Sequence, residues 1–236
     1  MAHEIENIHC RRESPRTNIF RSDYLSVQPL QQWLNDVAPQ YAKGILVDYG
    51  CGNSPYRSNF AGQVERYIGV DVAQNKLNSV DEVVPPGMPL PVQDNSIGTV
   101  LSTQTLEHVS EPEFYLREVF RVLSPGGKLL LTCPAAYMLH EEPNDFFRFT
   151  KYGLRHLLEK VGLRIVRIDT AGGAWRLVGQ VLLNHKTFGR KWTIPVMSAV
   201  IYYCLAPIAN LVFSFLDRVN TNSKDTTNYM IIAEKS

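Results

Sequence analysis

The sequence predicts an α/β protein with a doubly wound, mostly parallel sheet that helices cover on both faces. From Gly44 onward, short runs rich in β-branched and aromatic residues alternate with amphipathic stretches at helical spacing. This alternation is typical of parallel sheets built from strand and helix units. The chain has 236 residues, of which 44% are hydrophobic and 20% charged, enough for one sizeable α/β domain with an added element.

The first segments lie ahead of the sheet. Residues 1 to about 24 are polar and lack periodicity, which indicates an extended arm, and residues 1–16 contain no apolar run of a secretory signal. Apolar residues then recur at helical spacing from Leu30 to Val37, with Pro39 near the end of the run. We therefore predict a short amphipathic helix that covers one edge of the main domain.

Six strands and two clear helices follow. The strands are expected at residues 45–49, 67–71, 81–84, 99–103, 128–133 and 163–169, and the helices at 111–123 and 150–161. Between Ser124 and Lys128, two adjacent glycines end a predicted helix and precede a strand, as at many helix C-termini.

Charge and cysteine usage exclude several classes of function. The formal net charge is +1 and no basic stripe with interleaved aromatic residues is present, so no nucleic-acid partner is expected. Cys10, Cys51, Cys133 and Cys204 lie far apart without paired spacing. This spacing predicts neither a metal site nor a disulfide framework, and it favours a reducing, cytoplasmic setting.

A glycine-containing turn follows the first predicted strand. Gly50 and Gly52 come just after Asp48, where glycines let the backbone approach a ligand, although a tight turn alone also uses them. The second strand ends in Asp71, and a carboxylate at that position can accept both hydroxyls of a ribose. The two features together favour an adenosine-containing ligand.

The same turn disfavours a dinucleotide. A nicotinamide fingerprint needs a third small residue where this chain has Pro55. The negative charge of Asp48 also suits a cationic, amino-acid-bearing ligand better than a pyrophosphate. A nicotinamide-dependent oxidoreductase is therefore only a third alternative.

Five stretches between residues 44 and 169 carry a family resemblance. They read VDYGCGNSP, YIGVDV, LPVQDNSIGTVLSTQTLEHV, LREVFRVLSPGGKLLLTCP and HEEPNDFFRFTKYGLRHLLEKVGL. The chain resembles the class I S-adenosylmethionine-dependent methyltransferases, in particular the type 11 group. The resemblance implies a Rossmann-like sheet of seven strands, with the last strand antiparallel and inserted beside the sixth. Residues 227–235, TNYMIIAEK, fit that last strand.

The resemblance also implies the cofactor, S-adenosylmethionine, and the residues that hold it. They are Asp48, Gly50 and Gly52 for the methionine end, Asp71 for the ribose, Met88 and Leu90 beside the adenine, and Gln104 near the sulfonium. Three positions depart from the family pattern: Ser54 replaces a frequent glycine, Pro86 an acidic residue, and Gly98 the usual Asp.

The acceptor is expected beside the loop that follows the fifth strand. Methyl transfer requires orientation and sometimes a base, so the candidate catalytic residues are His108, His140 and Glu141. His140, Asp145 and Arg148 are the candidate substrate-binding residues. The alternative is a salt-bridged structural loop, with a structural His108 and with Glu107 as a capping or orienting group.

Residues 192–216 form an apolar run without any charge. Its length would suffice for a membrane span. If the last strand belongs to the same sheet as the strands before the run, however, both ends of the run must lie on one side of the membrane, which excludes a single crossing. Pro195, Pro207 and Asn210 suggest two short helices or one kinked helix. Three roles stay open: a membrane-surface element, a lid over an apolar acceptor, or a patch buried against the domain or a second subunit of a homodimer.

The predicted organisation has four parts: an arm and helix at 1–42, a methyltransferase core at 43–173, an apolar helical insert at 174–222 and the final core strand at 223–236. The predicted function is methyl transfer from S-adenosylmethionine to a small-molecule or lipid-like acceptor, in the cytoplasm with a peripheral membrane position as an option. The alternative is a non-catalytic protein of the same fold that acts as a membrane-associated or partner-binding module.

Overall fold

The computed structural model describes residues 17–184, 195–220 and 222–236, with side chains of the last helix described from Cys204 onward. Residues 1–16 of the predicted arm and the first residues of the apolar run, 192–194, lie outside these ranges.

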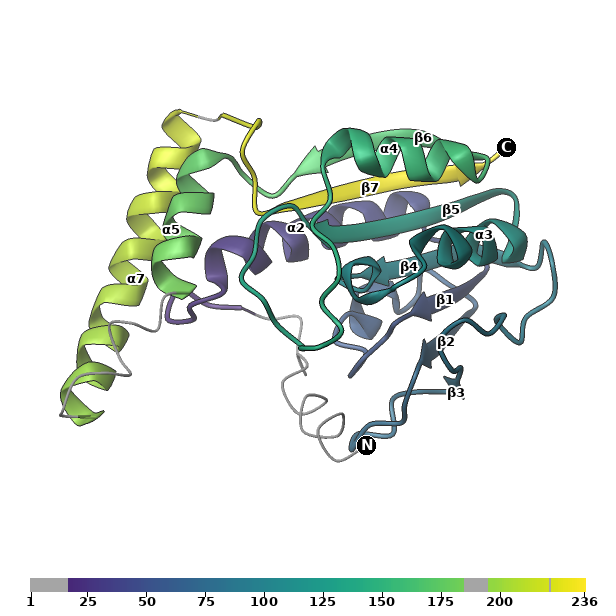
Figure 1. The fold of residues 1–236 in the computed structure, drawn as a ribbon, viewed down its shortest axis with the longest axis horizontal. Coiled ribbons are helices and arrows are strands. Elements are labelled where there is room, and N and C mark those ends of the chain that lie inside the picture. The colour runs from purple at the N-terminus through teal and green to yellow at the C-terminus, as the bar shows by residue number, and fades with distance from the viewer. Residues whose placement is uncertain (1–16, 185–194, 221) are drawn as a thin grey trace.

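Seven strands form one sheet in the order β3-β2-β1-β4-β5-β7-β6 (Figure 1). The strands are β1 (Ile45–Tyr49), β2 (Arg66–Asp71), β3 (Glu82–Val83), β4 (Ile97–Thr103), β5 (Leu123–Pro134), β6 (Leu163–Thr170) and β7 (Asn228–Lys235). The first five strands pair in parallel, and β7 lies antiparallel between β5 and β6. The predicted fold class, with its antiparallel last strand, is confirmed.

Helices cover both faces of the sheet. Because neighbouring strand residues point to opposite faces, Val47 packs in a core with helices α3 (Pro112–Val122) and α4 (Lys151–Lys160), whereas Leu46 packs with α2 (Tyr24–Tyr41). The expected position of the first helix was wrong. Leu30, Leu34 and Val37 of α2 are buried in the core of that second face, so the helix covers a face of the sheet and not an edge.

The predicted turn at Ser124–Lys128 lies inside β5. Ile97 pairs with Leu123 and Thr99 with Lys128, so residues 124–127 loop out of the ladder opposite Gly98. Gly126 has a φ of +75°, which a residue with a Cβ rarely adopts. The glycines therefore make a local irregularity within the strand, and α3 already ends at Val122.

Two further helices lie beyond one end of the sheet (Figure 1). Helix α5 (Ala174–Asn184) packs against α7 (Pro195–Val219), and both contact α2. Helix α7 is one continuous helix that contains Pro207, so of the two expected forms the pair of short helices was wrong. Asp217 of α7 links the two helices, because its carboxylate accepts hydrogen bonds from the backbone N–H groups of Gly173 (3.0 Å), just before α5, and of Arg176 (3.3 Å) within α5. None of the helices within the described ranges has the length and apolar character that a membrane crossing requires.

Candidate functional site

The strand order places a ligand site at the carboxyl ends of β1 and β4. The chain proceeds outward from β1 to β2 and β3 and then returns to the other side of β1 with β4. In open parallel sheets, ligands bind at such a reversal of strand order. The side-chain oxygen of Thr105, just beyond β4, donates to the carbonyl of Gly50, just beyond β1, at 3.2 Å. The two segments that form the reversal are therefore in direct contact.

The turn after β1 requires its glycines. Gly50 has a φ of +82° and Gly52 a φ of +52°. A Cβ at Gly50 would lie 2.2 Å from Cγ2 of Thr105, so this glycine is needed for contact within the protein as well as for the backbone conformation. Ser54, which stands where the family often has a glycine, also adopts a positive φ, +48°, and its hydroxyl donates to the carbonyl of Ser79 at 3.3 Å.

Asp71 closes this turn. Its carboxylate accepts the N–H of Gly52 at 2.7 Å through one oxygen and the N–H of Val72 at 2.7 Å through the other. The residue is 5% exposed and lies at the end of β2, where the ribose-binding carboxylate was expected. The same carboxylate therefore fixes the shape of the glycine turn in this structure.

Asp48 has an acceptor atom without a partner. The side chain is buried at the end of β1, and the Tyr67 hydroxyl donates to Oδ2, while Oδ1 has no hydrogen-bond partner within the described residues. Burial raises the pKa of Asp48 to about 7, against the lowering effect of the Tyr67 hydrogen bond. A buried carboxylate oxygen in this state favours a donor from a ligand, above all a cationic one.

The residues expected near the adenine and the sulfonium differ in exposure. Met88 is 53% exposed, whereas Leu90 is buried in the core on the α3 face and its N–H donates to Glu118. Gln104 directly follows β4 with a φ of +52°, and its side-chain amide donates to Thr132 at 3.2 Å. Of these three, Met88 and Gln104 lie where a ligand can reach them without a change in the core.

The acceptor-side residues gather in the structure. His108 ends the short helix η3 (Leu106–His108), and its Nδ1 lies 2.8 Å from the carbonyl of Asn144 in the loop after β5. In that loop, Arg148 donates to both oxygens of Asp145, at 2.6 and 2.7 Å. His140 Nδ1 lies 3.3 Å from Asp145 Oδ2, and the rings of His108 and His140 meet edge to face at 4.7 Å. The sequence thus identified residues that the fold brings together.

The electrostatics of this loop depend on Asp145. Burial alone would raise the pKa of Asp145, but the hydrogen bonds from Arg148 and from the backbone of His140 outweigh it and lower the pKa to about 2. The carboxylate is therefore charged at neutral pH and is paired with Arg148. Burial and the neighbouring His108 lower the pKa of His140. Glu141, in the same loop, has a φ of +52° and contributes a like charge that raises the pKa of Glu107.

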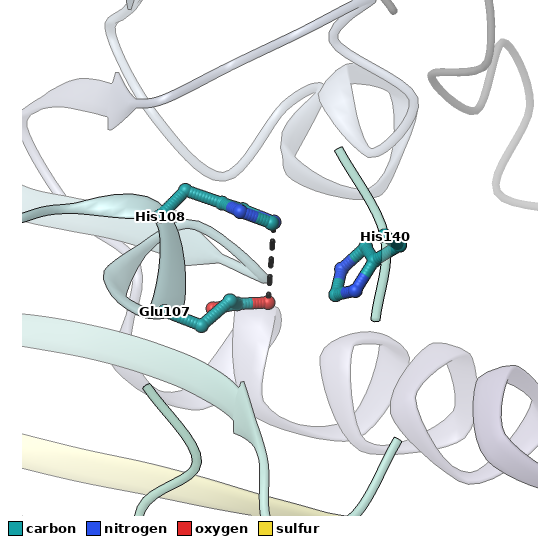
Figure 2. A group of neighbouring side chains, drawn as sticks. All are labelled: Glu107, His108 and His140. Carbon is teal, nitrogen blue, oxygen red and sulfur yellow. Dashed lines mark ion pairs between the residues drawn. The ribbon is translucent and has the colours of Figure 1, made fainter. Parts of the chain in front are cut away.

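From the sequence, Glu107 was expected only as a capping or orienting group and not as a site residue. Figure 2 shows its carboxylate opposite His108, with His140 beside both. The side chain is fully buried, and burial raises its pKa to about 8, against the lowering effects of its own backbone N–H and of Arg148. In the sequence, Glu107 looks like an ordinary first-turn carboxylate, and only the burial of η3 under the later loop distinguishes it.

The arrangement agrees with the comparisons with known proteins. A family model described as a methyltransferase domain, of type 11, matches residues 47–131, from β1 into β5. The chain carries a type 11 methyltransferase domain. The matched range includes Asp48, the glycine turn, Asp71 and η3, and it agrees with the predicted family resemblance.

Relatives of known sequence match part of the chain. The chain is 30% identical over 109 residues to an uncharacterized methyltransferase of Mycobacterium leprae, and the match covers 42% of this chain and 40% of the relative. It is 29% identical over 123 residues to an uncharacterized methyltransferase of Schizosaccharomyces pombe, covering 47% and 49%. The match therefore spans less than half the length of these relatives.

Solved structures share the fold across most of the chain. A phosphoethanolamine N-methyltransferase of Haemonchus contortus in complex with S-adenosylmethionine has a TM-score of 0.58 at 15% identity, covering 98% of this chain and 60% of that one. The [4+2]-cyclase SpnF has a TM-score of 0.55 at 19% identity, and the match covers 89% of this chain and 82% of the cyclase chain. Because a cyclase shares this fold, the fold alone does not determine the reaction of the methyltransferase domain.

The residues at the glycine turn fit the cofactor. The methionine end of S-adenosylmethionine carries an ammonium group, and the unpartnered Oδ1 of Asp48 beside the turn is an acceptor for such a donor. Gly98, which stands where the family usually has Asp, is explained by packing and not by the cofactor. A Cβ at Gly98 would lie 2.3 Å from the carbonyl oxygen of Lys43.

Proposed function

We propose that this protein transfers a methyl group from S-adenosylmethionine to a small or lipophilic acceptor. In this proposal the methionine end of the cofactor lies at Asp48, Gly50 and Gly52, and Asp71 accepts the ribose hydroxyls with its remaining lone pairs. Met88 and Gln104 complete the adenine and sulfonium side, whereas Leu90 lies in the core and is not part of this proposal. The sulfonium supplies an already activated methyl group, so the protein mainly has to orient donor and acceptor.

One observation carries the cofactor assignment. Asp48 Oδ1 is buried without a partner at the strand-order reversal, within the range that the methyltransferase family model matches. An unsatisfied buried acceptor costs about 1–3 kcal/mol, more when it is charged. Binding of the cofactor ammonium group would remove this cost, which supports a role of Asp48 in binding.

The acceptor side is proposed at His108, His140, Glu141, Asp145 and Arg148. These residues lie on η3 and on the loop after β5, at the same edge of the sheet as the glycine turn. Imidazole lone pairs can take a proton from an acceptor or hold it in place. The Arg148–Asp145 ion pair keeps the loop in a fixed conformation and so positions the two histidines.

The proposed acceptor class includes lipophilic molecules because of the surface on α5 and α7. Large apolar side chains on this surface are exposed: Trp175, Val178, Val181, Leu182, Leu205, Ile208, Leu211, Val212, Phe215 and Val219. Contiguous exposed apolar surface of this kind marks interaction sites. We propose that this surface contacts a membrane, where a lipophilic acceptor would be found.

The test of the function combines binding and turnover. Calorimetric titration with S-adenosylhomocysteine should show one site on the wild-type protein and weaker binding to Asp48→Asn. Incubation with methyl-labelled S-adenosylmethionine and cell extract, separated into aqueous and lipid fractions, should then label an acceptor. Absence of cofactor binding contradicts the proposal, and binding without labelling in either fraction supports the non-catalytic alternative.

A further inference from the structure

The carboxylate of Glu107 and the imidazoles of His108 and His140 converge on one point from two separate segments (Figure 2). One possible ligand atom from each residue lies within 4.8 Å of the other two, and His108 Nε2 lies 3.9 Å from Glu107 Oε1. The loop that carries His140 is fixed over η3, because the N–H groups of Phe146 and Phe147 donate to the backbone carbonyl of Glu107. The convergence therefore depends on backbone contacts as well as on side chains.

The Glu107 carboxylate has no partner in this arrangement. The residue is 0% exposed, and neither carboxylate oxygen has a hydrogen-bond partner within the described part of the chain. A buried carboxylate is normally paired with a cation or hydrogen-bonded, since burial without compensation costs several kcal/mol. The two imidazoles lie beside the carboxylate, so a ligand shared by all three side chains would compensate its burial.

The hydrogen bonds of the histidines leave their Nε2 atoms available. His108 Nδ1 faces the carbonyl oxygen of Asn144 at 2.8 Å, and a carbonyl only accepts, so this nitrogen carries the proton. His140 Nδ1 faces the carbonyl oxygen of Met138 at 3.2 Å and Asp145 Oδ2 at 3.3 Å. Both of these partners are acceptors and likewise favour a protonated Nδ1. The lone pair of each ring then lies on Nε2.

Among the described residues, the guanidinium of Arg148 lies beside His140. Its Nη2 lies 3.4 Å from His140 Nδ1, but it already donates to Met138 at 3.0 Å and to Asp145 at 2.7 Å. Asp145 neutralises the guanidinium and lies near Nδ1 of both histidines, 4.0 Å from that of His108 and 3.3 Å from that of His140. A carboxylate or carbonyl behind each imidazole is the usual environment of histidines that bind metal ions.

We propose that Glu107, His108 and His140 bind a divalent transition-metal ion. Two imidazoles and one carboxylate suit zinc, iron, cobalt or nickel, whereas magnesium and calcium prefer oxygen ligands alone. Ligand atoms around a tetrahedral zinc ion lie roughly 3.3 Å apart, given metal–ligand distances of about 2.0–2.1 Å. The separations in the cluster must therefore shorten by at most about 1.5 Å, and the partly exposed side chain of His140 gives the room for this.

Three protein ligands leave a coordination position open, as in catalytic and not structural zinc sites. η3 begins directly after Thr105, which contacts Gly50 of the glycine turn. Resting on the methyl transfer proposed above, the open position binds an oxygen of the acceptor and orients it toward the methyl donor. The metal site itself does not depend on that function.

The experiment uses the full chain freed of metal by chelation and then titrated with Co²⁺, followed by its visible absorption and by calorimetry. We expect one Co²⁺ per chain in the wild type and at least a 10-fold weaker affinity in His140→Ala and Glu107→Gln. Asp145→Asn should lower the affinity about 10- to 100-fold without removing a ligand. His156→Ala, at an exposed position on α4, is the matched control and should bind like the wild type.

Two results would overturn the site: no stoichiometric Co²⁺ binding by the wild type, or equal binding by wild type and His140→Ala. Because His140 is partly exposed, His140→Ala is expected to fold. This variant therefore decides the test even if Glu107→Gln does not fold. Titration of the same samples with S-adenosylhomocysteine separates this result from the proposed function. Cofactor binding without cobalt binding refutes the metal site alone, and the reverse result refutes the cofactor assignment alone.

Discussion

Thr105 occupies the space that a side chain at Gly50 would need. A Cβ on Gly50 would lie 2.2 Å from Thr105 Cγ2 and 2.4 Å from its hydroxyl oxygen, and the same hydroxyl donates to the Gly50 carbonyl. The glycine turn after β1 and the segment after β4 are thus interlocked. The glycine turn and η3 therefore form one unit at the carboxyl edge of the sheet.

Gly50→Ala should therefore cost more than backbone strain. The φ of +82° alone disfavours alanine by about 1–3 kcal/mol, and the clash with Thr105 adds to this. Gly62→Ala is the matched control, because Gly62 has a similar φ, +78°, and open space around it. Urea unfolding should show a larger stability loss for Gly50→Ala than for Gly62→Ala. Equal losses would mean that the contact with Thr105 is unimportant.

Asp48 should make stability depend on pH. Burial raises its pKa from 3.8 to about 7, so the folded state holds this proton more tightly than the unfolded state. The resulting stabilisation is fully present below about pH 3.8 and is lost as the pH rises through 7. At about 1.36 kcal/mol per pKa unit, the total is on the order of 4 kcal/mol.

Asp48→Asn removes this titration and tests it. The stability of the variant relative to wild type should rise between pH 4 and pH 7 and stay constant above, as measured by denaturant unfolding at each pH. Asp36→Asn, at an exposed position on α2, controls for the loss of a carboxylate at the surface. A pH-independent difference between Asp48→Asn and wild type would show that Asp48 is already charged in the folded protein.

The sequence predicted the sheet and the cofactor edge because both depend on local signals. Asp48, Gly50 and Asp71 lie at strand ends that hydrophobic runs define, and β1 has the predicted bounds. Glu107 could not be recognised as a site residue, because its burial depends on a loop that starts about thirty residues later in the chain. The position of α2 on a face was missed for the same reason, since an amphipathic pattern does not tell which surface it covers.

Gly98 shows a second limit of sequence reasoning, and it can be tested. The backbone of Lys43 lies against Gly98. Two hydrogen bonds between this backbone and the Thr99 hydroxyl, at 2.9 and 3.0 Å, hold it in place. Gly98→Ala should therefore destabilise the protein by roughly 2 kcal/mol or more. Gly87→Ala, where a Cβ meets nothing, should cost only its backbone strain. Thermal unfolding of the two variants would decide, and equal melting temperatures would refute the steric explanation.

The apolar surface on α5 and α7 should bind anionic lipid membranes. On α7, Leu205, Ile208, Val212, Phe215 and Val219 follow one another at intervals of three and four residues, so they form a single exposed stripe. A glutamate pair in this stripe would oppose transfer into the membrane interface. We therefore expect Ile208→Glu combined with Phe215→Glu to abolish sedimentation with vesicles that contain anionic lipids.

The matched control for the membrane test is Tyr152→Glu, since Tyr152 is 76% exposed on α4, away from the stripe. This variant should sediment with vesicles like the wild type. Because Ile208 and Phe215 are 57% and 64% exposed, their replacement removes little core packing, and unchanged circular dichroism would verify the fold. The stripe also has the spacing of a helix that pairs with another helix. A wild type that stays in the supernatant but elutes as a dimer, with the double variant monomeric, would assign the surface to a second copy and refute the membrane contact.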